Sequence, residues 1–244
     1  MKLAIMQPYF FPYIGYFQLI NAVDKMLLYG NVTYRKRDWV NRNQLLNKSN
    51  GKAFFITAPI QSGSSNKLIK ATLLSPDNSW KNKLLKDVYM NYKKATFFDE
   101  TYPLIERLVS NSAVDLMSYN VDAISNICHY LSINTELLAN DIFYTDIENE
   151  LISENIPASE IKTERIIKLC KKHNATQYIN PIGGTEQYNK QAFSSKGIAL
   201  SFIQSMPVEY NQFGNCIPNL SIIDVLMHLG ISASQLFLTK YEMV

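Results

Sequence analysis

The sequence predicts an α/β protein built on a mainly parallel, Rossmann-like sheet. Short apolar runs of strand length alternate with longer segments of helical periodicity, the pattern of parallel α/β folds. The first thirty residues read strand, loop, helix, strand, which is the start of a βαβ unit. With 244 residues, 47% of them hydrophobic, the chain can bury a substantial core. We therefore expect a single domain over residues 1–244, with a mostly helical insertion or cap at about residues 80–155.

The βαβ unit begins with the apolar run Lys2–Met6, which predicts a buried strand that ends at a proline turn. Tyr16–Val23 repeats apolar residues at helical spacing, and Asp24–Tyr29 reads as a second buried strand. The next strand is predicted at Phe54–Pro59, before a polar, serine-rich segment at Gln61–Lys67.

The rest of the chain continues the alternation. The predicted helices are Trp80–Tyr92, Pro103–Ser110, Val114–Leu131, Glu160–Lys172 and Ile222–Leu229, the last ended by Gly230. The predicted strands are Thr176–Asn180 and Ile198–Ile203.

Composition and charge argue against several classes of protein. The net charge of +3 comes without the clustered basic face of a nucleic-acid binder. No run of eighteen apolar residues occurs, so we expect no membrane span. Cys128, Cys170 and Cys216 form no CxxC pair, which argues against a disulfide framework or a zinc site. We expect a cytoplasmic protein without a bound metal.

The turn after the first strand is a candidate ligand site. Ligands of open α/β sheets bind at the carboxyl ends of strands, where a helix N-terminus offers free N–H groups to an anion. The candidate binding residues are Gln7, Pro8, Tyr9 and Gly15. Two prolines and a glycine also make an ordinary tight βα turn, so a purely structural explanation stands beside this one.

The same turn resembles the HxGH loop of adenylyl- and cytidylyltransferase-like enzymes, including pantothenate synthetase. Tyr13-Ile14-Gly15-Tyr16 takes the place of that loop, and both histidines are absent. Neutral tyrosines stabilise the charge of a phosphate only weakly. The resemblance therefore implies a nucleotide-binding fold more than it implies nucleotidyl transfer.

A basic and aromatic segment follows the second strand. Its cations suit phosphates, its aromatic rings suit bases or sugars, and its amides suit hydroxyl groups. The candidate contacts are Asn31, Tyr34, Lys36, Trp39, Asn41, Arg42 and Asn43. This combination favours a nucleotide-sugar pyrophosphate. The alternative is an exposed basic loop that its tryptophan anchors to the core.

Two later positions are further candidates for ligand binding. Gly183 and Gly184 follow a predicted strand and could cradle a phosphate or a sugar, or simply form a turn. Ser221 and Asp224 open the last long helix and could contact a ribose hydroxyl. Their spacing equally suits a helix cap of the capping-box type.

Several of these motifs together resemble the WbqC-like protein family. They are Met6-Gln7-Pro8, Pro12-Tyr13-Ile14-Gly15-Tyr16-Phe17, Trp39-x-Asn41-Arg42-Asn43, Tyr178–Gly184, Tyr210-Asn211-Gln212 and Leu220–Asp224. Many relatives carry an acidic pair where this chain has Gly30-Asn31, which weakens any metal-dependent mechanism. The resemblance implies a role in bacterial surface-polysaccharide biosynthesis of the O-antigen type.

Pathway and motifs together suggest an enzyme that transfers an acyl or aminoacyl group to the amine of a dTDP- or UDP-linked sugar. Tyr13, Tyr16 or Asp24 would position the amine or carry its proton. Lys36 and Arg42 would hold phosphates, and ATP is one candidate co-substrate. The alternatives are a glycosyltransferase of the same pathway and a non-catalytic nucleotide-sugar-binding protein. A homo-oligomer is compatible with each of them.

Overall fold

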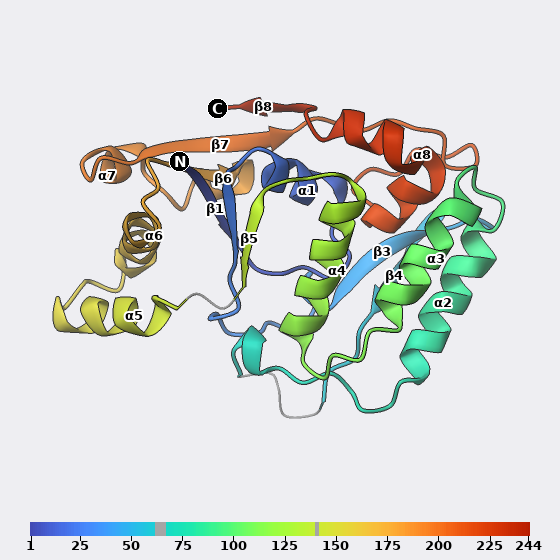
Figure 1. Cartoon of the computed structure of the whole chain (residues 1–244), viewed down its shortest axis with the longest axis horizontal. Helices are drawn as coiled ribbons and strands as arrows, with labels where there is room; N and C mark the ends of the chain where they lie inside the picture. The colour runs from blue at the N-terminus through green and yellow to red at the C-terminus, as the bar shows by residue number, and fades with distance from the viewer. Residues whose placement is uncertain (62–66, 140–141) are drawn as a thin grey trace.

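The computed structural model describes residues 1–61, 67–139 and 142–244 (Figure 1). Residues 62–66 of the predicted serine-rich segment therefore lie outside the description. The central sheet has the strand order β5-β2-β1-β6-β7-β8. Its strands are β1 Lys2–Met6, β2 Lys25–Leu28, β5 Glu136–Ala139, β6 Gln177–Pro181, β7 Ala199–Ser205 and β8 Tyr241–Met243. All pair in parallel except β8, which runs antiparallel to β7. The predicted fold class, a mainly parallel α/β sheet, is confirmed.

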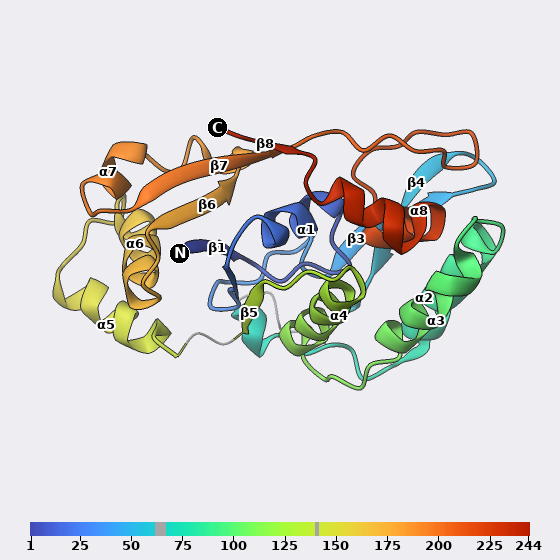
Figure 2. The ribbon, with the colours of Figure 1, turned by 45° about the horizontal axis from the view of Figure 1, so that its top comes forward.

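The sheet separates two hydrophobic cores because successive side chains of a strand point to opposite faces. In β1, Leu3 and Ile5 belong to one core and Ala4 to the other. The core around Leu3 is covered by α5 Tyr144–Ser153, α6 Ile161–Lys172 and α7 Lys190–Ser194. The other is covered by α1 Ile14–Asn21, α2 Ser79–Tyr92, α3 Phe98–Val109, α4 Leu116–Tyr130 and α8 Ile222–Phe237. Figures 1 and 2 show these two groups of helices on opposite sides of the sheet.

The chain between β2 and β5 carries a separate hairpin and three of the helices. The hairpin pairs β3 Arg42–Asn47 with β4 Lys52–Thr57 in antiparallel register, and the short η2 Ile69–Ala71 leads on to α2. Sequence analysis predicted β4 but missed β3, because Arg42-Asn43-Gln44 lacks the apolar residues that mark a strand. It also missed β5, which interrupts the helical stretch predicted at about 80–155. Only four residues long, β5 pairs with β2 at the edge of the sheet.

The last helix departs from its predicted end. Gly230 adopts φ 64° and ψ −172°, which breaks the helical geometry, yet helix resumes and continues to Phe237. A side chain at this position would collide with the ring of Phe97, 2.5 Å from the place of its Cβ. Gly230 therefore kinks the helix rather than ending it. None of the described helices is both long and apolar enough to cross a membrane.

Candidate functional site

The strand order places a topological switch point between β1 and β6. From β1 the chain moves outward to β2 and β5, whereas β6 and β7 lie on the other side of β1 (Figure 2). The paired register of β1 and β6 includes only Lys2 with Gln177 and Leu3 with Tyr178. Beyond these pairs the two strands are no longer bonded to each other. In open α/β sheets, ligands bind in the crevice that such a divergence leaves at the carboxyl ends of the strands.

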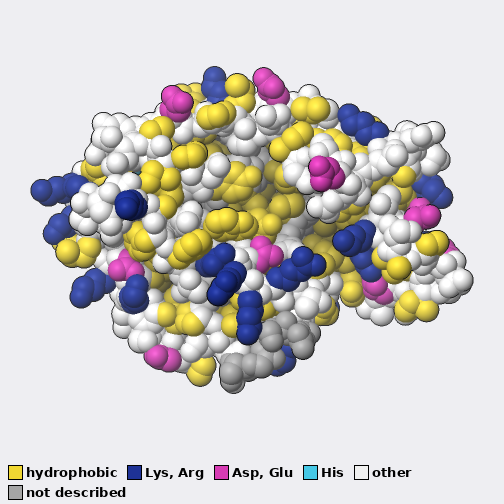
Figure 3. All heavy atoms as spheres, turned by 180° about the vertical axis from the view of Figure 1, so that it is seen from behind, with side chains coloured by type: hydrophobic (Ala, Val, Ile, Leu, Met, Phe, Trp, Pro, Cys, Tyr) yellow, Lys and Arg dark blue, Asp and Glu magenta, His cyan; other side chains and the backbone are white. Residues whose placement is uncertain are grey.

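Two cavities lie at these strand ends, and they share Tyr9 and Pro181 as lining residues. One has a volume of about 640 Å³ and the other about 610 Å³, both within the size range of small-molecule sites. Figure 3 shows a face of the molecule that is hollowed over a largely hydrophobic floor, with Lys and Arg side chains along its rim. We call the cavity of about 640 Å³ the charged cavity and the cavity of about 610 Å³ the neutral cavity, after the side chains that line each of them.

The charged cavity is bordered by three cations. Arg35 comes from the loop after β2, and Lys162 and Arg165 come from α6. Arg165 forms an ion pair with Glu148, with Nη2 3.0 Å from Oε2, whereas Arg35 and Lys162 form no ion pair within the described residues. Asp38 is the one acidic side chain among the described residues that line either cavity. The remaining lining includes Gln7, Asn180, Gly183 and Gly184.

The neutral cavity is lined by aromatic and amide side chains, without a charged one among its described lining residues. Tyr9, Tyr13 and Trp39 supply the rings. Asn43, Gln44, Gln204 and Asn219 supply the amides. One of the two interpretations of the basic segment required Trp39 to anchor the loop to the core. Trp39 is 42% exposed, so it does not do so. The buried tryptophan is Trp80, on α2.

The turn from Gln7 to Tyr13 is held by buried side chains that bond to its carbonyl groups. Asn120 of α4 donates to the carbonyl of Pro8 at 2.8 Å and to that of Val40 at 2.7 Å. Asn43 donates to the carbonyls of Phe10 and Phe11, the latter at 2.7 Å. Ser221 also donates to Phe11, which has a φ of 41°. These bonds fix an otherwise unfavourable backbone and so preorganise the walls of both cavities.

Tyr9 and Tyr13 keep their protons at neutral pH. Burial, with Asp38 and Tyr13 close by, raises the pKa of Tyr9 to about 12, and burial also raises the pKa of Tyr13. Gly15 allows the Tyr13 ring to lie over the start of α1, because a Cβ at position 15 would meet that ring at 2.3 Å. Both phenols can therefore donate a hydrogen bond to a ligand.

Several residues proposed from the sequence lie away from the cavities. Tyr16 is 2% exposed and donates its hydroxyl hydrogen bond to the carbonyl of Gln7 at 2.8 Å. Asp24 lies at the amino end of β2, where its carboxylate accepts from the backbone N–H of Lys2 at 2.7 Å. Because the cavities lie at the carboxyl ends of the strands, Asp24 lies at the opposite end of the strands from the cavities.

Other proposed residues of the basic segment hold the fold. Tyr34 donates to Asn41 at 3.0 Å, and the amide of Asn41 donates to the carbonyl of Ala58. The guanidinium of Arg42 stacks on Phe55, 4.4 Å from the ring centroid. Asn31 is buried, and Lys36 is exposed; neither lines a cavity described above.

Ser221 caps the start of α8, as its position predicts, but Asp224 does not complete the capping box, because the N–H of Ser221 donates to the carbonyl of Gln44 at 3.0 Å. Ser221 Oγ accepts from the N–H of Ile223, and Asp224 lies in the first turn. Asp224 is fully buried and accepts from Tyr92 and Tyr210 at 2.6 Å each, and from Gln212 at 3.0 Å. His228, one turn further, packs against Tyr92 and Tyr210. We call Asp224, Tyr92, Tyr210, Gln212 and His228 the Asp224 cluster; it lines neither strand-end cavity.

The structure adds residues that sequence reasoning missed. Arg35 and Asp38 stood inside the proposed segment. Nothing in the sequence distinguished Arg35 from Lys36 and Arg42, and Asp38 was the one acidic residue of the segment and received no role. Lys162 and Arg165 lie on an amphipathic helix whose charges resemble any solvated face. Asn120 looks like a polar interruption of a helix, and only its burial shows that it clamps the turn. Among the described residues, no group of three or more His, Cys, Asp or Glu side chains is placed to hold a metal ion.

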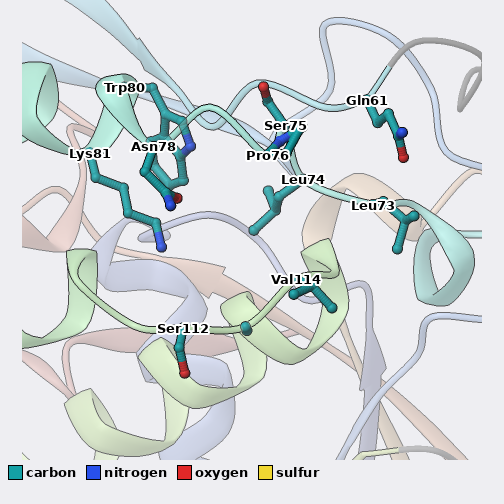
Figure 4. Close-up of a pocket in the computed structure, with 11 residues that line it drawn as sticks. Gln61, Leu73, Leu74, Ser75, Pro76, Asn78, Trp80, Lys81, Ser112 and Val114 are labelled. Atoms are coloured by element: carbon teal, nitrogen blue, oxygen red, sulfur yellow. The ribbon is translucent and has the colours of Figure 1, made fainter.

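A further cavity of about 440 Å³ lies between the start of α2 and the loop before α4 (Figure 4). Leu73, Leu74, Pro76 and Val114 make most of its surface apolar. Lys81 is the one cation among the described residues that line this cavity. It donates to the carbonyl of Asn111, and burial lowers the pKa of this lysine. No strand of the central sheet contributes to this cavity, so the switch-point argument does not apply to it.

Comparison with known proteins identifies a family and a relative. The family model for WbqC-like proteins matches residues 7–236. The uncharacterized protein Rv1507c of Mycobacterium tuberculosis is 30% identical over 236 residues, which cover 95% of each chain. No solved structure matches the chain.

Proposed function

The chain belongs to the WbqC-like protein family, and on that premise we propose that it is an enzyme that binds a nucleotide-linked amino sugar between β1 and β6 and acylates the sugar amine. The observation that carries this proposal is the charged cavity at the switch point. Surface-polysaccharide biosynthesis of the O-antigen type is the pathway we propose for the product, in keeping with the resemblance of the sequence motifs.

The charged cavity suits a diphosphate. Arg35 and Lys162 keep their charges uncompensated by any described ion-pair partner, and an arginine can hold two phosphate oxygens at once. In proteins with an open α/β sheet, nucleotides also bind beyond the carboxyl ends of the strands, where this cavity lies. The preorganised turn limits the ordering that binding requires, which favours affinity.

Asp38 is the residue that suits the amine. It lines the charged cavity together with Tyr9, whose pKa is raised first by burial and then by the charge of Asp38, so its carboxylate lies near the residue that both cavities share. In the proposed step the amine nitrogen bonds to the acyl carbon of a donor that carries a leaving group, such as an acyl phosphate or a thioester. The bond from that carbon to the leaving group breaks, and Asp38 accepts the proton that the amine releases.

The first experiment combines binding with product analysis. We expect UDP- or dTDP-linked amino sugars to raise the melting temperature, since a ligand at 100 times its Kd adds about 2.7 kcal/mol of stability. With acyl donors present, mass spectrometry should find a product that keeps its nucleotide and gains the acyl mass. Release of nucleoside diphosphate with transfer of the sugar would instead identify a glycosyltransferase. Absence of any binding would contradict the assignment of the crevice.

The role of Asp38 has its own test. Asp38→Asn should lower kcat by roughly 100-fold or more, since it removes the proton acceptor, and should change the Kd of the nucleotide sugar little. Asp99→Ala, at the exposed start of α3, is the matched control and should leave both constants unchanged. An Asp38→Asn enzyme of full activity would exclude this carboxylate as the base.

A further inference from the structure

We infer that the neutral cavity holds the sugar ring of the same ligand whose diphosphate occupies the charged cavity, with Trp39 as its stacking platform. This inference rests on the proposed function and adds the second half of the binding site. It makes Trp39, Tyr13 and Gln204 residues that determine sugar specificity, and it orients the ligand along the crevice.

The residues that line the neutral cavity match the chemistry of a sugar ring. A sugar ring has apolar C–H faces and a rim of neutral hydroxyl groups, so its ideal partners are aromatic faces and amides. The neutral cavity offers three aromatic rings and the side-chain amides of Gln44, Gln204 and Asn219 among its described lining residues, while the amide of Asn43 already bonds to the turn. A second phosphate or a carboxylate would meet no cation there, because no described lining residue is charged.

The two cavities adjoin each other. Tyr9 and Pro181 line both cavities, so a single extended ligand can cross from one to the other over these two residues. The carboxyl ends of β1 and β6 reach this point through Gln7 and Pro181. A sugar joined to a diphosphate has this form: one charged part directly linked to one neutral part.

The side chains of Trp39 and Gln204 are accessible to a ligand. Trp39 has its backbone fixed, since its carbonyl accepts from the N–H of Phe10 at 3.0 Å, while its side chain remains 42% exposed. A large aromatic ring on a fixed backbone at the wall of a cavity loses little freedom when a ligand stacks on it. Gln204 is exposed at the end of β7, and no described residue accepts a hydrogen bond from its amide. Both side chains are thus free to contact a ligand.

The experiment compares ligands with and without the sugar. Calorimetric titration of UDP, dTDP, UDP-glucosamine and dTDP-glucose is carried out with the full chain and four variants, Trp39→Ala, Gln204→Ala, Arg35→Ala and Tyr89→Ala. Trp39→Ala should raise the Kd of the two sugar-bearing ligands about tenfold and leave UDP and dTDP within twofold. Arg35→Ala should weaken all four by a similar factor, because it contacts the part that they share. Tyr89→Ala, an aromatic residue that is 45% exposed on α2, is the control and should change none of them.

The outcomes separate the inference from the proposed function. If Trp39→Ala weakens UDP as much as UDP-glucosamine, the aromatic wall holds the base and the inference is overturned. If Trp39→Ala and Gln204→Ala leave every Kd unchanged while Arg35→Ala raises them, the diphosphate site stands and the sugar does not enter the neutral cavity. If the wild-type chain binds none of the four probes, the proposed function itself fails. Melting curves for each variant confirm that the fold is retained.

Discussion

The Asp224 cluster and the two strand-end cavities are built from the same side-chain types, yet they differ in where their hydrogen bonds go. In the cluster, the carboxylate of Asp224 accepts three bonds, from the buried Tyr92 and Gln212 and the half-buried Tyr210. Tyr92 also accepts from the N–H of Leu46. At the strand ends, no described residue bonds to the hydroxyls of Tyr9 and Tyr13 or pairs with the charge of Arg35. Groups that remain unpaired beside a cavity are available to a ligand.

This difference separates structural from functional polar residues. A buried polar group costs free energy unless it is paired, so the stability of the fold depends on the hydrogen bonds within the cluster. The hydroxyls of Tyr9 and Tyr13 and the charge of Arg35 have no described partner, so removing them leaves no group of the fold unpaired. Substitutions in the cluster should therefore lower stability, and substitutions in the cavities should lower binding or activity.

The largest expected effect is the loss of stability in Asp224→Ala. Removing the carboxylate takes an acceptor from Tyr92, Tyr210 and Gln212, of which the fully buried Tyr92 hydroxyl loses its acceptor outright. We expect the free energy of unfolding to fall by about 3–5 kcal/mol. Urea denaturation measures this change. A loss below about 1 kcal/mol would mean that water enters and satisfies the cluster.

Asn120→Ala should connect the two regions, since Asn120 is a buried structural residue that holds a wall of the site. The carbonyls of Pro8 and Val40 would lose their donor, which should lower the free energy of unfolding by about 2–3 kcal/mol. Nucleotide-sugar binding should weaken as well, because the turn would no longer be fixed. Asn126→Ala is the control, since Asn126 bonds only within its own helix turn. Unchanged ligand affinity in Asn120→Ala would show that the turn is rigid without this clamp.

A smaller effect is expected in the pH dependence of stability. Burial lowers the pKa of His228 below its usual 6.5, although the nearby Asp224 opposes this shift. The unfolded chain therefore binds a proton at a higher pH than the folded one, and stability falls as the pH drops through the range below 6.5. His228→Gln should remove this part of the slope. Melting temperatures between pH 8 and pH 5 test it, and parallel curves for the two proteins would contradict the assignment.

The smallest effect is expected from Lys36→Ala. Lys36 is one residue from Arg35 in the sequence but lines neither cavity, so the Kd of a nucleotide sugar should change less than twofold. Arg35→Ala in the same titration is the matched comparison. If both variants lose affinity equally, the loop acts as a diffuse basic surface, and the contrast between lining and non-lining cations is lost.

The sequence by itself predicted the fold class and four of the six strands of the central sheet that the structure describes. Alternating apolar periodicity was sufficient for β1, β2, β6 and β7 and for the long helices, because burial of an apolar face imposes that pattern locally. It failed at β3, β5 and β8. These short strands are defined by the strand they pair with, and their own residues carry little apolar pattern.

The tertiary structure decided which polar residues face the site. Tyr13 and Tyr16 lie in one motif, but α1 turns one ring toward a cavity and the other into the core. Arg35, Lys36 and Arg42 share a charge and a segment, and only the path of the loop brings Arg35 to the crevice. Arg165 arrives from a helix more than a hundred residues away. A hydrogen-bond partner or a cavity wall is a relation between distant segments, and local composition cannot encode which of several similar side chains will enter into it.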